Sequence, residues 1–275
     1  MITTKMEMIK EREAEGERDE EEDVDLDIRL MRYEHLMDRR PFLVNDVLLR
    51  QNPNNVIEWQ QRVLLWGDNK DKVVETYTQA IQTIHPKKAH GKLQDLWAKF
   101  ARFYEDNGDI ESARAIFEKA VKVNYKTVND LADIWCEYAE METRQGDFDR
   151  AIDIMARATQ TPKLLNMNSK HVNFHDESLP VHHRLFKSLR LWNFYIDLEE
   201  SVGTVESTKA VYDKVLDLRI ANPQTIVNYA TFLEENQYFE ESFKVYERGI
   251  DLFGYPIAFE LWNIYLERFL KRYVS

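Results

Sequence analysis

The residues best suited to chemistry by type and spacing are the histidines of one short segment. His171 and His175 are four positions apart, so on a helix they would lie on one side, and Asp176 could add an oxygen ligand for a metal ion. His182 and His183 follow shortly after. The segment is nevertheless bounded by prolines, holds several turn-forming residues and has no cysteine, so we interpret it as a surface loop and predict no metal site.

Nucleophilic and acid–base chemistry is equally unsupported by the sequence. Cys136, the only cysteine, follows a tryptophan within a predicted helix, where it is interpreted as a small buried residue. Glu142, Glu199 and Glu200 end predicted helices at a recurring position, which indicates a structural or solvated role. No GxGxxG, P-loop, HExxH, GxSxG or paired CxxC motif occurs. We therefore predict that the protein is not an enzyme, with no catalytic residues, no cofactor and no small-molecule substrate.

Basic side chains gather near several predicted turns and helix ends. Lys87, Lys88, Arg184, Lys187 and Arg190 could touch an RNA backbone at the rim of a larger assembly. Solvated surface charge is the alternative interpretation. The formal net charge of −12 argues against a protein whose main task is to coat nucleic acid, because phosphate neutralisation supplies most non-specific affinity.

The composition narrows the fold class. Hydrophobic residues make up 44% of the 275, enough for a sizeable core, whereas glycine (8) and proline (7) are scarce, which disfavours many-stranded β folds. A single cysteine indicates a reducing compartment. We find no signal peptide and no apolar run long enough to cross a membrane, so no membrane association is expected.

The elements that would position these side chains recur along the chain. Tryptophans mark a register whose first two intervals are both 38 residues, and an isoleucine fills one slot. The register positions are Trp59, Trp97, Trp135, Trp192, Ile226 and Trp262. A bulky apolar face at helical spacing follows each position, and a second segment, such as 111–121 or 149–159, repeats apolar residues at i, i+3, i+4 and i+7. Each unit is therefore a helix, a turn and a helix.

Such units predict an all-α fold, an α-solenoid of stacked antiparallel helix pairs resembling TPR proteins. We divide the chain into an acidic, mobile flank (1–23), a degenerate helical repeat (24–53) and a repeat array (54–275) with an insertion loop at about 163–187. In the degenerate repeat, Pro41 is expected to start a helix. The count is about five full pairs and a final half-pair, and the register side chains are expected to be buried between neighbouring units.

The first helices, with Trp-x2-aromatic and a later Glu, and the second helices of the ARAIFEKA type resemble HAT (half-a-TPR) repeats. Longer stretches, including LMDRRPFLVNDVLLRQNPNNVIEW and KSLRLWNFYIDLEESVGTVESTKAVYDKVLDL, are similar to the Syf / XPA-binding protein (crooked-neck-like) family of pre-mRNA-splicing factors. The resemblance implies a non-catalytic, nuclear scaffold of the spliceosome. It also implies association with Prp-nineteen-complex and Aquarius-type helicase subunits and a link to transcription-coupled repair. Contact with snRNA or pre-mRNA backbone is expected from the basic side chains and not from the resemblance.

Two other functions remain open from the residues alone. A TPR-type peptide-binding adaptor or co-chaperone would need a repeated column of Lys and Arg on the inner helices, and none is seen. An RNA reader taking one base per repeat would need polar residues at fixed positions and usually a basic chain, which the acidic composition disfavours.

Overall fold

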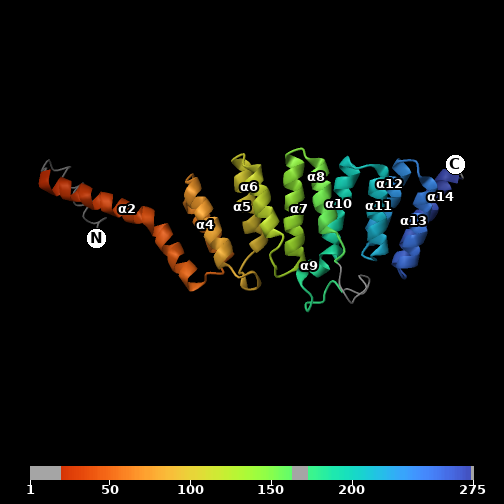
Figure 1. Cartoon of the computed structure of the whole chain (residues 1–275), viewed down its shortest axis with the longest axis horizontal. Coiled ribbons are helices and arrows are strands. Elements are labelled where there is room, and N and C mark those ends of the chain that lie inside the picture. Colours follow the sequence, from red (N-terminus) through yellow and green to blue (C-terminus); the bar gives the residue numbers. More distant parts are fainter. Residues whose placement is uncertain (1–19, 163–172, 274–275) are drawn as a thin grey trace, which may run out of the picture. The chain divides into compact units, whose positions relative to one another are not determined.

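The computed structural model describes residues 20–162 and 173–273. Every regular element within these ranges is a helix and none is a strand, as Figure 1 shows. The all-α prediction is therefore confirmed. The chain separates into two compact units, residues 1–84 and residues 85–275, which we describe one at a time.

Unit 1 holds one long helix followed by a helix pair. Helix α2 spans Glu20–Gln51, α3 spans Val56–Leu65 and α4 spans Lys70–Thr83. Asn55 and Asn69 cap the starts of α3 and α4 by accepting hydrogen bonds from the backbone N–H groups of Ile57 and Lys72. The pair α3–α4 is the first pair of the repeat array predicted for residues 54–275.

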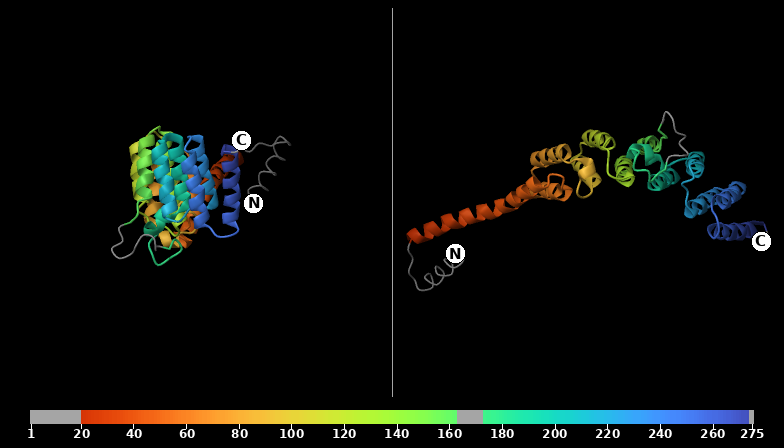
Figure 2. Two further views of the ribbon diagram at one scale, coloured as in Figure 1. Left: turned by 90° about the vertical axis from the view of Figure 1, so that its right-hand side faces the viewer. Right: turned by 90° about the horizontal axis from the view of Figure 1, so that it is seen from below.

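Unit 2 is a stack of antiparallel helix pairs. The pairs are α5 (Leu93–Asp106) with α6 (Ile110–Ala120), α7 (Val128–Arg144) with α8 (Phe148–Ala158), α10 (Leu189–Val202) with α11 (Val205–Asp217), and α12 (Pro223–Glu235) with α13 (Phe239–Leu252). Helix α14 (Ile257–Tyr273) follows as a half-pair, and short helices η1 (Pro86–Lys88), α9 (Val181–Arg184) and η3 (Leu185–Lys187) lie between pairs. Figure 2 shows the pairs following one another in chain order. With α3–α4, the described residues contain the five pairs and the half-pair expected.

The turns inside the pairs follow from local residue chemistry. Gly108 and Gly146 adopt positive φ angles of 79° and 81°, which favour glycine and end α5 and α7. The next residue in each case, Asp109 or Asp147, accepts a hydrogen bond from a backbone N–H of the second helix, so the same few residues stop one helix and start the next. This arrangement makes α5–α6 and α7–α8 tight antiparallel pairs.

The second helices carry a column of small residues where they pack against the first helices. The aligned positions are fully or almost fully buried, and they are Ala80, Ala120, Ala158, Val215 and Gly249. Gly249 leaves no room for a larger residue: a Cβ atom there would lie 2.7 Å from Cγ2 of Ile226, the register residue that replaces tryptophan. The smallest side chain therefore stands opposite Ile226.

We expect Gly249→Ala to destabilise the protein by about 1–3 kcal/mol, because the added methyl group overpacks the contact with Ile226. Urea unfolding followed by circular dichroism measures the effect. Gly254→Ala is the matched control, since a Cβ there meets nothing within 4 Å. Equal losses in the two variants would contradict the packing explanation, and combining Gly249→Ala with Ile226→Ala should cost less than the sum of the single changes.

The predicted helix start at Pro41 is wrong. Pro41 lies inside α2, which continues for ten residues beyond it, and Figure 1 shows this helix bent along its length. Proline removes one backbone hydrogen bond but does not end a helix whose following turns are held by packing. Asn45, four residues later, is buried and donates to the backbone oxygen of Glu58 at 2.9 Å on α3. Residues 20–23, assigned to the mobile flank, are the first turn of α2, and residues 1–19 lie outside the described part.

The insertion is only partly a loop. Residues 163–172 lie outside the described part, but Val181–Lys187 form α9 and η3, whose side chains include the buried Val181, Leu185 and Phe186. The prediction of a surface loop is therefore wrong for 181–187. The apolar residues of this stretch were missed because they are too few to show a helical period, whereas in the fold they pack against neighbouring helices such as α7.

Candidate interaction surfaces

The register side chains lie where neighbouring helices pack, with one exception. Trp59, Trp97, Trp135, Trp192 and Ile226 are at most 8% exposed. The indole N–H of Trp59 donates to Pro53 O at 2.9 Å and that of Trp192 to Phe186 O at 2.6 Å, six residues earlier in both cases. In these two repeats the indole N–H therefore also holds the chain segment that precedes the first helix.

Trp262 is the exception, and the expectation that it is buried is wrong. It is 42% exposed on α14, which packs against α13 and α12, and within the described residues no later helix pairs with α14 to cover its other side. Other large apolar side chains of α14 share this exposure: Phe259, Leu266, Phe269, Leu270 and Tyr273. The inner side of the same helix joins an aromatic cluster in which Phe243 contacts Tyr265 at 5.6 Å between ring centroids.

The glutamates that end the first helices have structural partners. Glu142 is fully buried and accepts two hydrogen bonds of 2.7 Å from the guanidinium of Arg114, on the preceding repeat. Glu199 is also buried and accepts from Ser207 at 2.6 Å. Neither carboxylate is left for acid–base work, which agrees with the structural interpretation of the recurring position.

Ion pairs at the repeat spacing tie successive units together. Arg144 donates to Glu105 at 2.8 Å and Arg157 to Glu118 at 2.9 Å, each across 39 residues. Hydrogen bonding from the arginine lowers the pKa of Glu105 and of Glu118. A carboxyl whose folded pKa is lowered stabilises the fold above its ordinary pKa, and this contribution is lost as the pH falls through the lowered value. Because these pairs are partly exposed, each is expected to add about 1 kcal/mol of stability or less.

The structure separates the five predicted rim residues. Arg184 is 7% exposed and donates to Phe174 O at 2.9 Å, so its prediction as a rim contact is wrong: burial hides its guanidinium. Arg190 is exposed and pairs with Asp133 at 2.9 Å. Lys87 donates to Tyr125 O at 2.9 Å, Lys187 is half-buried, and Lys88 is exposed. The five residues therefore do not form one site.

Cys136 is inert by its surroundings. The side chain is buried, and burial raises the pKa of its thiol to about 12, so the thiolate is strongly disfavoured near neutral pH. We expect Cys136 to react with a disulfide reagent such as DTNB only slowly in the folded protein and fully after denaturation. Rapid reaction of the native protein, at the rate of free cysteine, would contradict this placement.

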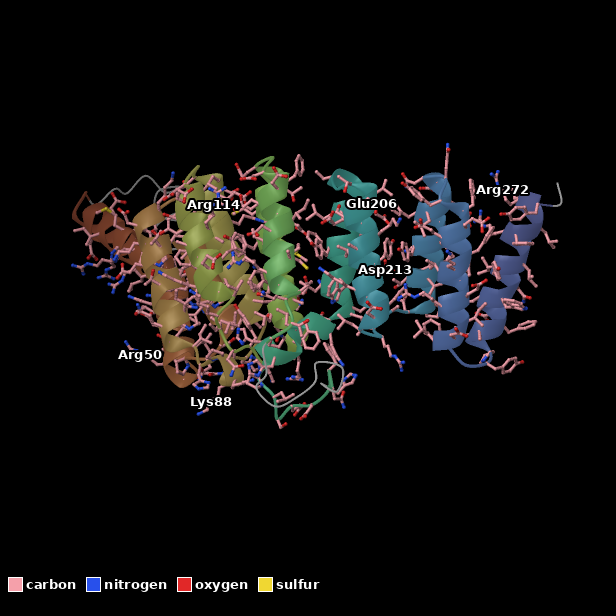
Figure 3. The ribbon with its side chains drawn as sticks, turned by 45° about the vertical axis from the view of Figure 1, so that its right-hand side comes forward. Arg50, Lys88, Arg114, Glu206, Asp213 and Arg272 are labelled. Atoms are coloured by element: carbon pink, nitrogen blue, oxygen red, sulfur yellow. The ribbon has the colours of Figure 1, made fainter. Side chains whose placement is uncertain are left out.

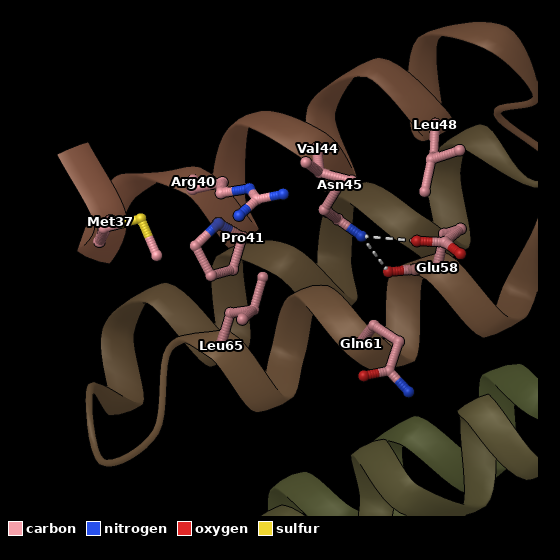
Figure 4. A pocket seen from close by; sticks show the side chains of 9 residues that line it. All are labelled: Met37, Arg40, Pro41, Val44, Asn45, Leu48, Glu58, Gln61 and Leu65. Atoms are coloured by element: carbon pink, nitrogen blue, oxygen red, sulfur yellow. Dashed lines mark hydrogen bonds between the residues drawn. The ribbon is translucent and has the colours of Figure 1, made fainter. Parts of the chain in front are cut away.

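Unit 1 has an apolar groove between α2 and α3, of about 450 Å³, shown in Figure 4. Apolar side chains supply most of its lining: Met37, Pro41, Val44, Leu48 and Leu65. Asn45 spans the groove by donating to the backbone and side-chain oxygens of Glu58 at 2.9 and 3.0 Å. The groove lies on the part of α2 that packs against α3.

The described residues contain no cluster of histidine, cysteine and carboxylate side chains able to hold a metal ion. His171, half of the histidine pair considered from the sequence, lies outside the described part, and His175 is exposed. No helix within the described ranges is long and apolar enough to cross a membrane.

Family models match the chain over nearly its whole length. The model for the pre-mRNA-splicing factor SYF1 middle HAT repeat matches residues 1–84, and that for the pre-mRNA-splicing factor Syf1/CRNKL1 C-terminal HAT repeat matches residues 86–275. The chain belongs to the Syf1/CRNKL1 family of HAT-repeat proteins. The boundary between the two Syf1 models falls at the boundary between the two compact units, so each model describes one unit of this fold.

Curated relatives agree with the Syf1 family. The chain is 59% identical over 248 residues (90% of its length) to the pre-mRNA-splicing factor syf1 of Aspergillus fumigatus, and 51% identical over 246 residues (90%) to the pre-mRNA-splicing factor SYF1 of Homo sapiens. It covers only 29% and 28% of those two proteins. Among solved structures, the TPR protein YrrB superposes with a TM-score of 0.36 at 10% identity, over 78% of this chain and 96% of that one.

Two lysines outside the predicted rim set lie on the loop that Lys87 contacts. Lys122 and Lys126 are exposed on the loop between α6 and α7, the loop whose Tyr125 O accepts from Lys87. They are not adjacent in sequence, so they form no visible basic run. The sequence feature that could have identified them is the absence of any acidic residue in 121–127, which leaves that loop with a net positive charge.

Proposed function

We propose that this chain is a non-catalytic scaffold in pre-mRNA splicing that holds spliceosomal proteins along its helical repeats. The observation that carries the proposal is the match of two Syf1-type HAT models to consecutive parts of the chain, with relatives above 50% identity that are named pre-mRNA-splicing factors. The chain covers about a third of the length of these relatives or less, so the role concerns the surfaces that this portion presents.

The surface chemistry of the described residues supports a binding role. The recurring carboxylates and the cysteine are buried in structural contacts, whereas large apolar side chains remain exposed on α2 and α14. Exposed apolar surface of this kind is typical of protein–protein interaction. We further propose that the scaffold acts in the nucleus and that its partners include Prp-nineteen-complex and Aquarius-type helicase subunits.

The test is an affinity purification of the tagged chain from nuclear extract, with mass spectrometry and a parallel RNase-treated sample. Spliceosomal proteins, including the Prp-nineteen-complex and Aquarius-type subunits, should be recovered in both samples. The same chain after heat denaturation serves as the control for adhesion to exposed apolar surface. Recovery of chaperones alone would overturn the splicing scaffold in favour of a TPR-type adaptor, and loss of all partners after RNase would overturn direct protein binding.

A further inference from the structure

The two ends of the helix stack in unit 2 differ in charge. Turns inside the pairs lie at one end and connections between pairs at the other, because the helices alternate in direction (Figure 1). The turn at 105–111 holds four acidic residues and the turn at 234–241 holds another four, with no basic residue in either. The connections at 85–92 and 121–127 hold three and two lysines, with no acidic residue. Figure 3 shows Lys88 at the lower end and Glu206 at the upper end.

The two acid-free connections form one continuous surface, because a hydrogen bond joins them. The ammonium of Lys87, from the first connection, donates to Tyr125 O of the second at 2.9 Å across 38 residues. We call this surface the basic edge, and it consists of Lys87, Lys88, His90, Lys92, Lys122 and Lys126. All six residues are exposed, and the hydrogen bond from Lys87 holds the two loops side by side.

Acidic side chains lie beside part of the basic edge. Lys92 lines a polar hollow together with Asp95, Asp133, Glu137 and Glu140, and Lys122 contributes to lowering the pKa of Glu118. Lys88, His90 and Lys126 lie outside that hollow.

Asp130 is the first acidic residue after the second loop. Its carboxylate accepts hydrogen bonds from the backbone N–H of Thr127 and from the side-chain amide of Gln94, both at 3.1 Å. On the other side, His182 contacts Val121 O at 2.9 Å, which places the third connection against the second. The described residues of that third connection are mixed in charge, since they include Asp176 and Glu177 as well as basic residues, so we end the basic edge there.

We propose that the basic edge binds the sugar-phosphate backbone of RNA. The exposed lysines are strongly hydrated point charges that suit phosphate contacts without base recognition. The chain carries a net charge of −12, so a polyanion is repelled elsewhere and directed to this edge.

An acidic peptide fits the basic edge less well than RNA. Peptide recognition uses pockets for side chains in addition to charge, whereas the edge consists of five lysines and one histidine, and the hollow that Lys92 lines is polar. The basic edge shares no residue with the apolar faces of α2 and α14 invoked for protein partners. The inference therefore goes beyond the proposed scaffold function and does not depend on it.

The test measures binding of a fluorescently labelled single-stranded RNA to the full chain by anisotropy over a series of salt concentrations. The variant is Lys88→Glu/Lys122→Glu/Lys126→Glu. The control Lys70→Glu/Lys214→Glu/Lys244→Glu makes the same charge change at exposed lysines in α4, α11 and α13. Three single-strand phosphate contacts should contribute about 2 to the slope of log affinity against log salt, or roughly 20-fold between about 50 and 200 mM salt.

The edge variant should lose this salt-dependent part of the affinity, while the control variant and the conservative Lys88→Arg/Lys122→Arg/Lys126→Arg variant keep it. Unchanged melting by circular dichroism shows that each variant is folded. The proposal is overturned if the wild-type chain does not bind RNA at low salt, or if the edge and control variants lose equally. Binding of a poly-glutamate peptide in place of RNA would reassign the edge to an acidic protein segment.

Discussion

Trp192→Ala is expected to destabilise the protein by about 3–5 kcal/mol, the largest loss that we predict for a single apolar side chain. Trp192 is 1% exposed, so its removal leaves a cavity between repeats in addition to the lost burial. It also removes the indole donor to Phe186 O, which leaves a buried carbonyl of η3 without that partner. Urea unfolding followed by far-UV circular dichroism gives the change in the free energy of unfolding.

Trp262→Ala is the matched control, because it deletes the same side chain at the same repeat position. Trp262 is 42% exposed and buries less surface, so we expect about half of the Trp192 effect or less. Repeat arrays unfold with nearest-neighbour energetics, so hydrogen exchange should place the Trp192 effect in α10 and the helices beside it. Equal destabilisation by the two changes would contradict the assignment of these two environments.

Arg114→Met is expected to cost about 3–5 kcal/mol, because it leaves the carboxylate of Glu142 buried without its bidentate partner. Arg150 is the nearest replacement, but its Nε lies 3.9 Å from Glu142, beyond a good hydrogen bond. The effect is therefore a consequence of burial and not of charge pairing as such. Chemical unfolding at neutral pH, where the carboxylate is charged in the unfolded chain, measures it.

A double-mutant cycle separates the cost of an orphaned charge from loss of the arginine side chain. Arg114→Met combined with Glu142→Leu should recover most of the stability, because a buried ion pair replaced by apolar residues of similar volume is often close to neutral. Arg102→Met is the surface control, since the pair with Glu137 is half-exposed at 3.3 Å and should matter by about 1 kcal/mol or less. A double variant as unstable as Arg114→Met alone would contradict the explanation.

Local chemistry explains why most of the helix pairs could be predicted. The apolar period of 111–121 and 149–159, and the glycine at positions 108 and 146 followed by a capping aspartate, each depend only on neighbours in sequence. Prediction failed where distant packing decides: α2 runs through Pro41 because α3 holds its later turns, and the short stretch 181–187 is ordered by contacts with helices such as α7.

The candidate surfaces were predictable only in part, because exposure and partners depend on residues far away in the sequence. Lys87 and Arg184 both looked like rim cations, yet the first ties two loops together and the second is buried against Phe174. Trp262 shares the spacing of the buried tryptophans but lacks the flanking helix that would cover it among the described residues. A repeat pattern assigns a position in the unit and not its environment.

The all-helical repeat architecture, the boundaries of most pairs and the family could be predicted from the order of residues, because helical period, turn chemistry and motif similarity are local properties of the chain. Three features could be found only in the folded chain: which repeated residues are buried, which charges pair across 39 residues, and that two lysine-bearing loops meet in a basic edge. Those properties arise when repeats stack, since stacking brings side chains together that the chain order keeps a whole repeat apart.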